Sequence, residues 1–219
     1  MKNDYLTIKK TGSNELEIKK SRFICNIARI DSEEDATKFI NEVKADNKKA
    51  THNCYAYVIG QDDHVQRASD NGEPSGTAGV PILDAIKMIG IHNTVAVVTR
   101  YFGGIKLGAG GLIRAYSNAT TKAIEKAGVI KKVLQTEIKL SINYALFDQL
   151  NYHLKENNVN IIDTQYTDKV TIIISIDNNE VDEFKQKVIN LLNDNVTMVN
   201  GNEKYFEIDF NPYEDIKKD

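Results

Sequence analysis

Cysteine is scarce in this sequence, which has only Cys25 and Cys54 in 219 residues. Two cysteines are too few for a disulfide framework or a four-cysteine zinc site, so we expect two reduced, buried thiols. No run approaches the ~18 apolar residues that a membrane helix requires, and no apolar signal-peptide core follows Met1. The sequence therefore predicts a cytoplasmic protein without a membrane partner.

Excess charge is also small, because 28 Lys and Arg oppose 31 Asp and Glu and leave a net charge of −3. This balance argues against general nucleic-acid electrostatics, and 41% hydrophobic with 27% charged residues excludes a disordered or fibrous chain. The charges are unevenly divided: residues 1–130 contain 18 basic and 15 acidic side chains, whereas residues 131–219 contain 10 and 16. We expect domains at residues 1–130 and 131–212, followed by a charged tail at 213–219.

Residues 131–212 alternate between strand and helix periodicities. The expected elements are, in order, a strand at 133–142, a helix at 146–154, strands at 159–166 and 170–176, a helix at 181–191, and a strand at 196–210 that is interrupted near Gly201. Asn143 is the expected cap of the first helix, and Asn178 or Asn179 is the expected cap of the second. The order βαββαβ is ferredoxin-like, and this part carries no visible site chemistry.

Residues 1–130 contain a longer series of elements. The expected series is strands at 5–10 and 16–30, a helix after Ser32, a strand at 53–60, a loop from Gln61, a helix at 81–90, a strand at 94–99, and a helix at 110–127. Ser32 followed three residues later by Asp35 is typical of a helix start. Pro81 occupies a favoured position in the first turn of a helix.

Glycine is concentrated in one stretch, because nine of the thirteen glycines lie between residues 72 and 111. The first loop of this stretch covers residues 69–79, and its notable polar side chains are Asp70, Glu73 and Thr77. Two interpretations are open. The segment is either a binding loop or a long turn whose Asp and Asn side chains bond to their own backbone.

The second glycine-rich loop, residues 100–117, connects an expected buried strand to a helix. Glycine lets a ligand approach the backbone, and the start of a helix attracts anions. The loop lacks the Gly-Lys-Ser/Thr of a P-loop, and the dinucleotide fingerprint starting at Gly108 has Ile113 in place of its third glycine. The glycines indicate either an anion site or close packing of helix and strand. The candidate anion or nucleic-acid ligands are Arg67, Thr77, Arg100, Lys106, Gly108, Gly110, Gly111 and Arg114.

Catalytic chemistry is not evident in the sequence. His52 and Cys54 share a face of an expected strand and could form a thiol–imidazole pair. Side chains at this spacing run parallel, which is poor geometry for a hydrogen bond, so the alternative is a buried cysteine beside a polar histidine. The metalloprotease, serine-hydrolase and zinc-deaminase motifs are absent. Asp70, Glu73, His52 and Cys54 remain the only catalytic candidates, and we expect no metal and no cofactor.

Four blocks of this sequence resemble the YigZ/Impact family. They are KKSRFI at 19–24, HNCYAY at 52–57, SDNGEPSGTAG at 69–79 and RYFGGIKLGAGGLIRAYS at 100–117. The resemblance covers residues 1–130, and the βαββαβ part is similar to the smaller C-terminal domain of the bacterial members. One departure is Asn71, where the family commonly has a second Asp, and this disfavours a metal site of paired carboxylates.

The resemblance implies an α+β protein, in which a two-layer α/β domain like domain IV of elongation factor G precedes a ferredoxin-like domain like its domain V. Those domains work on the ribosome, and the eukaryotic Impact proteins regulate translation by interfering with activation of a stress kinase. We therefore expect a non-enzymatic regulator of translation or stress response that binds RNA, the ribosome or a translation protein through its glycine-rich face.

Two other functions are compatible with the same residues. One is an enzyme that acts on a phosphorylated small molecule or nucleotide at these loops, with Asp70 or Glu73 as general base. The other is a protein-interaction adaptor whose acidic second domain is the docking face for a protein partner.

Overall fold

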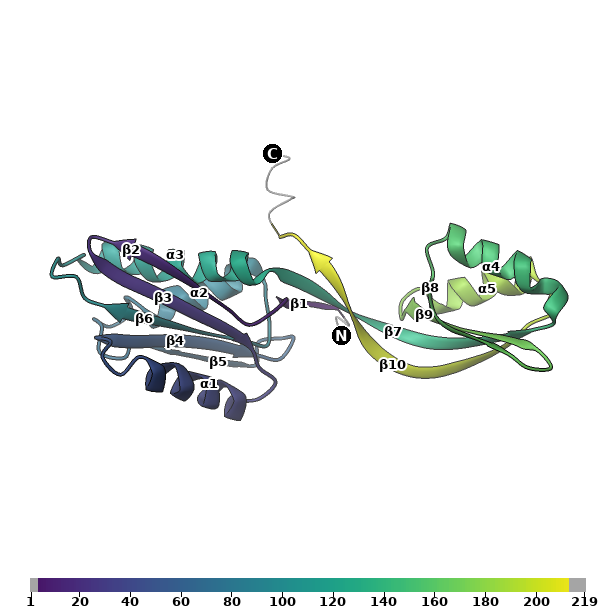
Figure 1. Cartoon of the computed structure of the whole chain (residues 1–219), viewed down its shortest axis with the longest axis horizontal. Helices are drawn as coiled ribbons and strands as arrows, with labels where there is room; N and C mark the ends of the chain where they lie inside the picture. Colours follow the sequence, from purple (N-terminus) through teal and green to yellow (C-terminus); the bar gives the residue numbers. More distant parts are fainter. Residues whose placement is uncertain (1–3, 213–219) are drawn as a thin grey trace. The chain divides into compact units, whose positions relative to one another are not determined.

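The computed structural model describes residues 4–212, so the expected tail at 213–219 lies outside the described residues. The chain divides into two compact units (Figure 1). The first unit consists of Asp4–Lys131 together with residues 208–212, and the second unit is Lys132–Glu207. The structure thus assigns residues 208–212, which the sequence placed in the second domain, to the first unit. Asp209 illustrates why, because its Oδ1 lies 2.6 Å from Lys9 Nζ.

An antiparallel five-stranded sheet forms the centre of the first unit (Figure 1). Its strands, in spatial order, are β2 (Gly12–Ile18), β3 (Ser21–Arg29), β6 (Thr94–Tyr101), β4 (His52–Ile59) and β5 (Val65–Ser69). The helices of this unit are α1 (Glu33–Asp46), α2 (Gly79–Ile89) and α3 (Ala109–Ala127).

The two faces of this sheet belong to different hydrophobic clusters. Along β6, Ala96 and Val98 pack with α2 and α3, whereas Val95 and Val97 pack with α1. A strand that is buried on both faces needs a continuous apolar run, which explains the valine-rich sequence of β6. Helices therefore cover both faces, and this unit has three layers, one more than the family resemblance implies.

Two strands of the first unit differ from the expectation. The run at 16–30 is not one strand but the β2–β3 hairpin, which turns at Lys19 and Lys20 with φ of 48° and 65°. Two-residue hairpin turns of this kind need positive φ, and their usual sequence signal is Asn-Gly. The expected loop from Gln61 contains the edge strand β5, whose residues are only partly buried or exposed and so lack an apolar pattern.

Local signals place the helix ends of the first unit well. Ser32 Oγ accepts a hydrogen bond from the Asp35 N–H at 3.1 Å, which confirms the predicted start of α1. Gly90, with φ of 74°, ends α2 in the left-handed conformation that glycine favours. No helix within residues 4–212 combines the length and hydropathy that crossing a membrane demands.

The second unit confirms the predicted ferredoxin-like order. Its elements are β7 (Val129–Ile142), the short 3₁₀ helix η1 (Tyr144–Leu146), α4 (Phe147–Glu156), β8 (Asn160–Tyr166), β9 (Val170–Asp177), α5 (Val181–Leu191) and β10 (Thr197–Phe210). Its sheet runs β7-β9-β8, with β10 also paired to β7. The strand β1 (Tyr5–Ile8), which belongs to the first unit, pairs with β7 as well, and β7 itself begins in the first unit at Val129. Alternate residues such as Ile138 and Leu140 on β7, and Ile172 and Ile174 on β9, form one core with α4 and α5.

Three local expectations for the second unit are wrong. The strand β10 continues through Gly201, because a Cβ there would lie only 3.1 Å from Glu137 Cβ and glycine leaves room for that neighbour. Neither Asn178 nor Asn179 caps α5, since Glu180 holds that position and Asn178 Oδ1 instead accepts from Thr136 Oγ1 at 2.7 Å. Asn143 provides no side-chain cap and precedes η1.

Gly103 is required where the loop after β6 crosses the β2–β3 turn. A Cβ at this position would lie 2.0 Å from the backbone carbonyl of Lys20, so we expect Gly103→Ala to lower the free energy of unfolding by roughly 1–3 kcal/mol. Gly110→Ala is the matched control, because a Cβ there meets nothing within 4 Å. It should gain up to about 1 kcal/mol from helix propensity. Urea unfolding measures both, and equal stabilities would contradict the steric argument.

Candidate functional site

The candidate site forms where three central strands of the first unit end side by side. Arg100 on β6 is paired in register with Phe23 on β3 and with His52 on β4. Because side chains alternate along a strand, Arg100 follows Ala96 and Val98 on the sheet face that α2 and α3 cover. The chemistry-bearing side chains of β4 and β6 therefore point toward the glycine-rich loops rather than toward α1.

A buried ion pair lies at the base of this site. Arg100 Nη1 donates to Glu73 Oε1 at 2.6 Å, and the two side chains are only 6% and 3% exposed. Tyr116 of α3 donates its hydroxyl to the same carboxylate oxygen at 2.8 Å. The guanidinium also lies 5.4 Å from the Phe23 ring centroid and 5.5 Å from that of Phe102. Within the described residues, the buried Arg100 Nε has no hydrogen-bond partner.

The loop at residues 69–79 is shaped by Asp70. Its Oδ1 accepts from the N–H groups of Ala78 and Gly79, and its Oδ2 accepts from the N–H of Gly76, all at 2.8–2.9 Å. Burial acts to raise the pKa of Asp70, but these three backbone hydrogen bonds outweigh it and hold the pKa below its ordinary value. Both carboxylate oxygens are occupied, so Asp70 stabilises the loop and the start of α2 and is badly placed to act as a base.

Of the three side chains that the sequence placed on this loop, only Glu73 faces the site. Thr77 is buried, and its Oγ1 donates to the Pro74 carbonyl at 2.6 Å inside the turn. The two interpretations of this loop therefore apply to different residues. Asp70 and Thr77 bond to the loop's own backbone, whereas Glu73 presents a carboxylate.

His52 is oriented by the same loop. Its Nδ1 lies 3.0 Å from the carbonyl oxygen of Asn71, and because a carbonyl only accepts, Nδ1 carries the proton in this contact. The other ring nitrogen, Nε2, lies 3.9 Å from Glu73 Oε2. The remaining Asn71 group is also engaged, since its Oδ1 accepts from the Asn53 N–H at 3.0 Å.

Cys54 does not form a pair with His52. Its thiol is buried and lies 2.8 Å from the carbonyl oxygen of Asp70 and 3.4 Å from Tyr116 Oη. Burial raises the pKa of the Cys54 thiol to about 12, so the thiol is neutral at physiological pH. Cys25 is likewise free and buried, and burial raises its pKa to about 12. A nucleophilic role for Cys54 has no geometric support.

A cavity of about 440 Å³ opens above the ion pair, a size typical of ligand pockets. Its lining combines polar, apolar and glycine residues from four segments: Thr51, His52, Glu73, Pro74, Arg100, Phe102, Lys106, Leu107, Gly108, Ala109 and Leu112. The start of α3 contributes Gly108 and Ala109, and Gly108 offers no side chain to cap the first N–H groups of the helix. These N–H groups are consequently available to a ligand.

The predicted row of basic residues is only partly assembled. Arg100, Lys106 and Gly108 line the cavity, and Gly110 and Gly111 follow in the first turn of α3. Arg67 does not join them, because it lies opposite Tyr57 on the edge strand β5, with its Nε 4.0 Å from Glu33 Oε2 at the start of α1. Arg114 is exposed on α3 and is not part of the cavity lining.

Two aromatic contributors could not be identified from the sequence. Tyr116 belongs to the apolar stripe of α3 and so has the pattern of an ordinary core residue. Phe102 follows the end of β6 and is 47% exposed beside Arg100. The described residues hold no group of three or more His, Cys, Asp or Glu side chains that could bind a metal ion.

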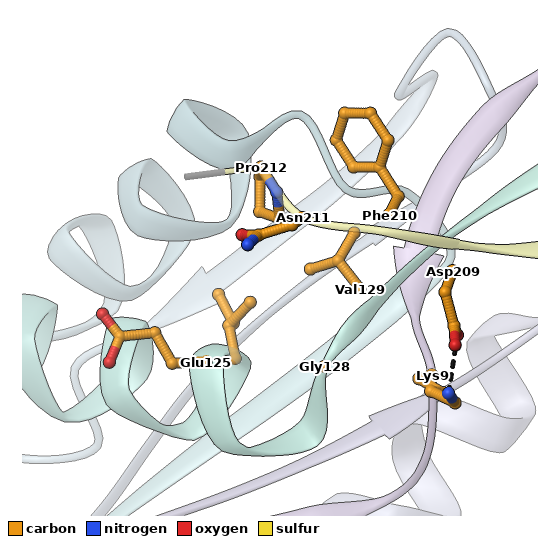
Figure 2. Close-up of a pocket in the computed structure, with 9 residues that line it drawn as sticks. Lys9, Glu125, Gly128, Val129, Asp209, Phe210, Asn211 and Pro212 are labelled. Carbon is orange, nitrogen blue, oxygen red and sulfur yellow. Dashed lines mark hydrogen bonds and ion pairs between the residues drawn. The ribbon is translucent and has the colours of Figure 1, made fainter. Parts of the chain in front are cut away.

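A larger cavity, of about 510 Å³, lies at the other end of α3 beside residues 208–212. Figure 2 shows the ion pair of Lys9 and Asp209 at this cavity, with Phe210, Asn211 and Pro212 along it. Both charged side chains are more than half exposed, and solvent screens such a pair. The smaller cavity is the better candidate, because only there do buried polar groups converge.

The chain resembles known proteins over most of its length. The Impact N-terminal domain matches residues 19–124, and a domain of unknown function (DUF1949) matches residues 140–195. The IMPACT family member YvyE of Bacillus subtilis (strain 168) is 41% identical over 94% of this chain and 95% of that protein. The IMPACT family member YigZ of Escherichia coli (strain K12) is 37% identical over 78% and 85%. A crystal structure of a hypothetical protein matches with a TM-score of 0.59 and 32% identity, covering 91% of this chain and 98% of that one.

We expect Asp70→Asn to be destabilising at neutral pH by about 1–2 kcal/mol, because a neutral amide cannot accept all three backbone hydrogen bonds. The lowered pKa makes this contribution complete above the unfolded pKa of about 4, and the contribution is lost as pH falls through the lower folded value. Urea unfolding across this range should show the difference between wild type and variant closing in acid. A difference that stays the same from neutral pH into acid, without any decrease, would contradict this role.

Glu73→Gln leaves the Arg100 guanidinium buried without a counter-charge. We expect it to cost roughly 3–5 kcal/mol in the free energy of unfolding. Glu15→Gln is the matched control, because it breaks the exposed Glu15–Arg22 pair, whose atoms lie 2.7 Å apart in solvent. The control should cost far less. Similar losses in urea unfolding would show that burial does not strengthen the Arg100–Glu73 interaction.

Proposed function

Because the chain belongs to the IMPACT family, we propose that it is a regulator of translation or stress response that binds single-stranded RNA, free or in the ribosome. The cavity at the start of α3 is the proposed binding site. The observation that carries the proposal is the combination, in one cavity, of the basic residue Lys106, the first N–H groups of a helix and the exposed aromatic ring of Phe102. Lys106 and the helix N–H groups suit the phosphates of an RNA strand, and the Phe102 ring suits a base.

Lys106 and the start of α3 form the proposed phosphate seat. Arg100 is the other basic side chain of the cavity, but Glu73 compensates its charge. Lys106 is exposed and forms no ion pair with any acidic residue that the structure describes. Its charge adds to the positive end of the α3 dipole, and backbone N–H groups at a helix start suit phosphate oxygens.

Phe102 is the proposed stacking platform for a base. Its ring is 47% exposed and sits beside the Arg100 guanidinium. Bases stack on such rings regardless of sequence, with roughly 1–3 kcal/mol for each base. An exposed aromatic ring next to a phosphate seat is the arrangement by which single-stranded nucleic acids are held.

Gly110 supplies an independent argument for a ligand at this helix start. It has no left-handed backbone angle, and a Cβ there would meet nothing within 4 Å. Glycine in a helix is destabilising by roughly 0.5–1 kcal/mol relative to alanine, so neither backbone nor packing explains it. A ligand that approaches the backbone of this turn would explain it.

The proposal is tested by the salt dependence of binding to a fluorescently labelled single-stranded RNA. Wild type should lose affinity as salt rises, and Lys106→Ala should lower the log–log slope by about 0.7, the value for one phosphate on a single strand. Arg67→Ala is the matched control, because Arg67 lies outside the cavity. It should leave the slope unchanged.

Two further measurements sharpen this test. Gly110→Ala should weaken RNA binding although the protein becomes no less stable, a combination that misfolding cannot produce. Sedimentation with ribosomes should follow the same order of variants. Binding that ignores salt, or a folded protein that binds neither RNA nor ribosomes, would overturn the proposal.

An enzyme acting on a phosphorylated small molecule is the second candidate, and His52 favours it. Nδ1–H is held by the Asn71 carbonyl and His52 lines the cavity, so in the neutral imidazole Nε2 is the nitrogen that can act as a general base. A screen of nucleotides and sugar phosphates tests this function. Turnover that His52→Asn abolishes would favour the enzyme, and absence of turnover across the screen would exclude it for those substrates.

A further inference from the structure

When His52 is neutral, two hydrogen-bond acceptors lie close together in the lining of the cavity. His52 Nε2 and Glu73 Oε2 lie 3.9 Å apart, and both side chains line the cavity. Nδ1 of His52 donates to the Asn71 carbonyl, so in the neutral imidazole Nε2 is a hydrogen-bond acceptor. Glu73 Oε1 already accepts from Arg100 and Tyr116, whereas Oε2 accepts no hydrogen bond from any residue that the structure describes.

This arrangement calls for a ligand group that donates two hydrogen bonds. The Glu73 side chain is only 3% exposed and the His52 side chain 19%, and both line the cavity. Neither Glu73 Oε2 nor His52 Nε2 is among the buried polar atoms that lack a partner in the described part of the chain, so solvent reaches both atoms, and a ligand group that donates to both would replace that water. A carbonyl oxygen in the same place would instead face two acceptors and be repelled.

The spacing of the two acceptors favours an amino group over a hydroxyl. A nitrogen about 2.9 Å from both atoms, which are 3.9 Å apart, would see them at an angle of about 85°. The two hydrogens of a planar amino group can serve both acceptors with a modest departure from linearity. A hydroxyl has one hydrogen and can satisfy only one of the two acceptors.

We propose that His52 and Glu73 recognise the exocyclic amino group of a nucleobase, so that the cavity prefers cytosine to uracil. The inference rests on the proposed RNA-binding function and names the base that the same cavity accepts. Carboxylates accept from the N4 amino group of cytosine in nucleic-acid recognition. Uracil has the same size but carries an oxygen acceptor at that position. Lys106 and the start of α3 would hold the adjoining phosphate, and Phe102 would contact the base.

The test compares binding of labelled oligocytidine and oligouridine of equal length at neutral pH. We expect wild type to bind oligocytidine roughly tenfold more tightly, the discrimination of one two-point contact to a base. His52→Asn should bring the ratio close to one, because asparagine can still donate to the Asn71 carbonyl but has no atom at the Nε2 position. Lys106→Ala is the control, since it should weaken both oligonucleotides equally and leave the ratio unchanged.

The outcomes separate this inference from the function on which it rests. Equal affinity of wild type for the two oligonucleotides would overturn the amino-group assignment and leave RNA binding intact. Failure to bind either one would overturn RNA binding itself. A ratio that survives in folded His52→Asn would also overturn the assignment. If that variant does not fold, the wild-type ratio still decides.

Discussion

The buried ion pair of Arg100 and Glu73 joins the three parts of the first unit that define the cavity. Arg100 lies near the end of the central strand β6, Glu73 belongs to the loop between β5 and α2, and Tyr116 connects α3 to the same carboxylate oxygen. An uncompensated charge in the interior is strongly destabilising. Each partner therefore constrains where the others can lie. The shape of the cavity is set by the sheet, by α3 and by the hydrogen-bonded loop between β5 and α2.

The loop that carries Glu73 depends on a second carboxylate with a different role. Asp70 gathers three backbone N–H groups and so fixes the turn from which Glu73 points toward Arg100. The Asp70 carbonyl is also the contact of the Cys54 thiol. Two acidic residues three positions apart thus have different roles. Asp70 fixes the backbone of the loop, and Glu73 supplies negative charge and hydrogen-bond acceptors to the cavity.

The periodicity of apolar side chains predicts the fold wherever those side chains pack into a single core. Ile138, Leu140, Ile172 and Ile174 alternate toward a single cluster, and the order of elements in the second unit follows from such patterns. It cannot predict features that depend on distant neighbours. The turn at Lys19 and Lys20 has no glycine of its own, and the glycine that makes room for it is Gly103, far along the chain.

The same limit applies to the candidate site, because the sequence predicts contacts within one segment but not contacts between distant segments. Lys106 and Gly108 precede a helix in sequence, so their meeting at its start follows from local reasoning. Arg100 and Glu73, which compensate each other's charge, are 27 positions apart, and Tyr116 and Glu73 are 43 positions apart. Charge alone predicts that Arg67 joins the site, whereas register on the edge strand places Arg67 beside Glu33. Spacing within loops is visible in a sequence, but pairing between strands is not.

The route of the chain has a consequence for dissecting this protein. Strand β7 leaves the first unit after Lys131, and β10 returns to it at Ile208, so the second unit is an insertion within the first. A fragment that stops at Lys131 would lack Asp209, the partner of Lys9, and Phe210, which lines the cavity at the end of α3. A fragment that preserves the first unit would replace residues 132–207 with a short turn and keep residues 208–212.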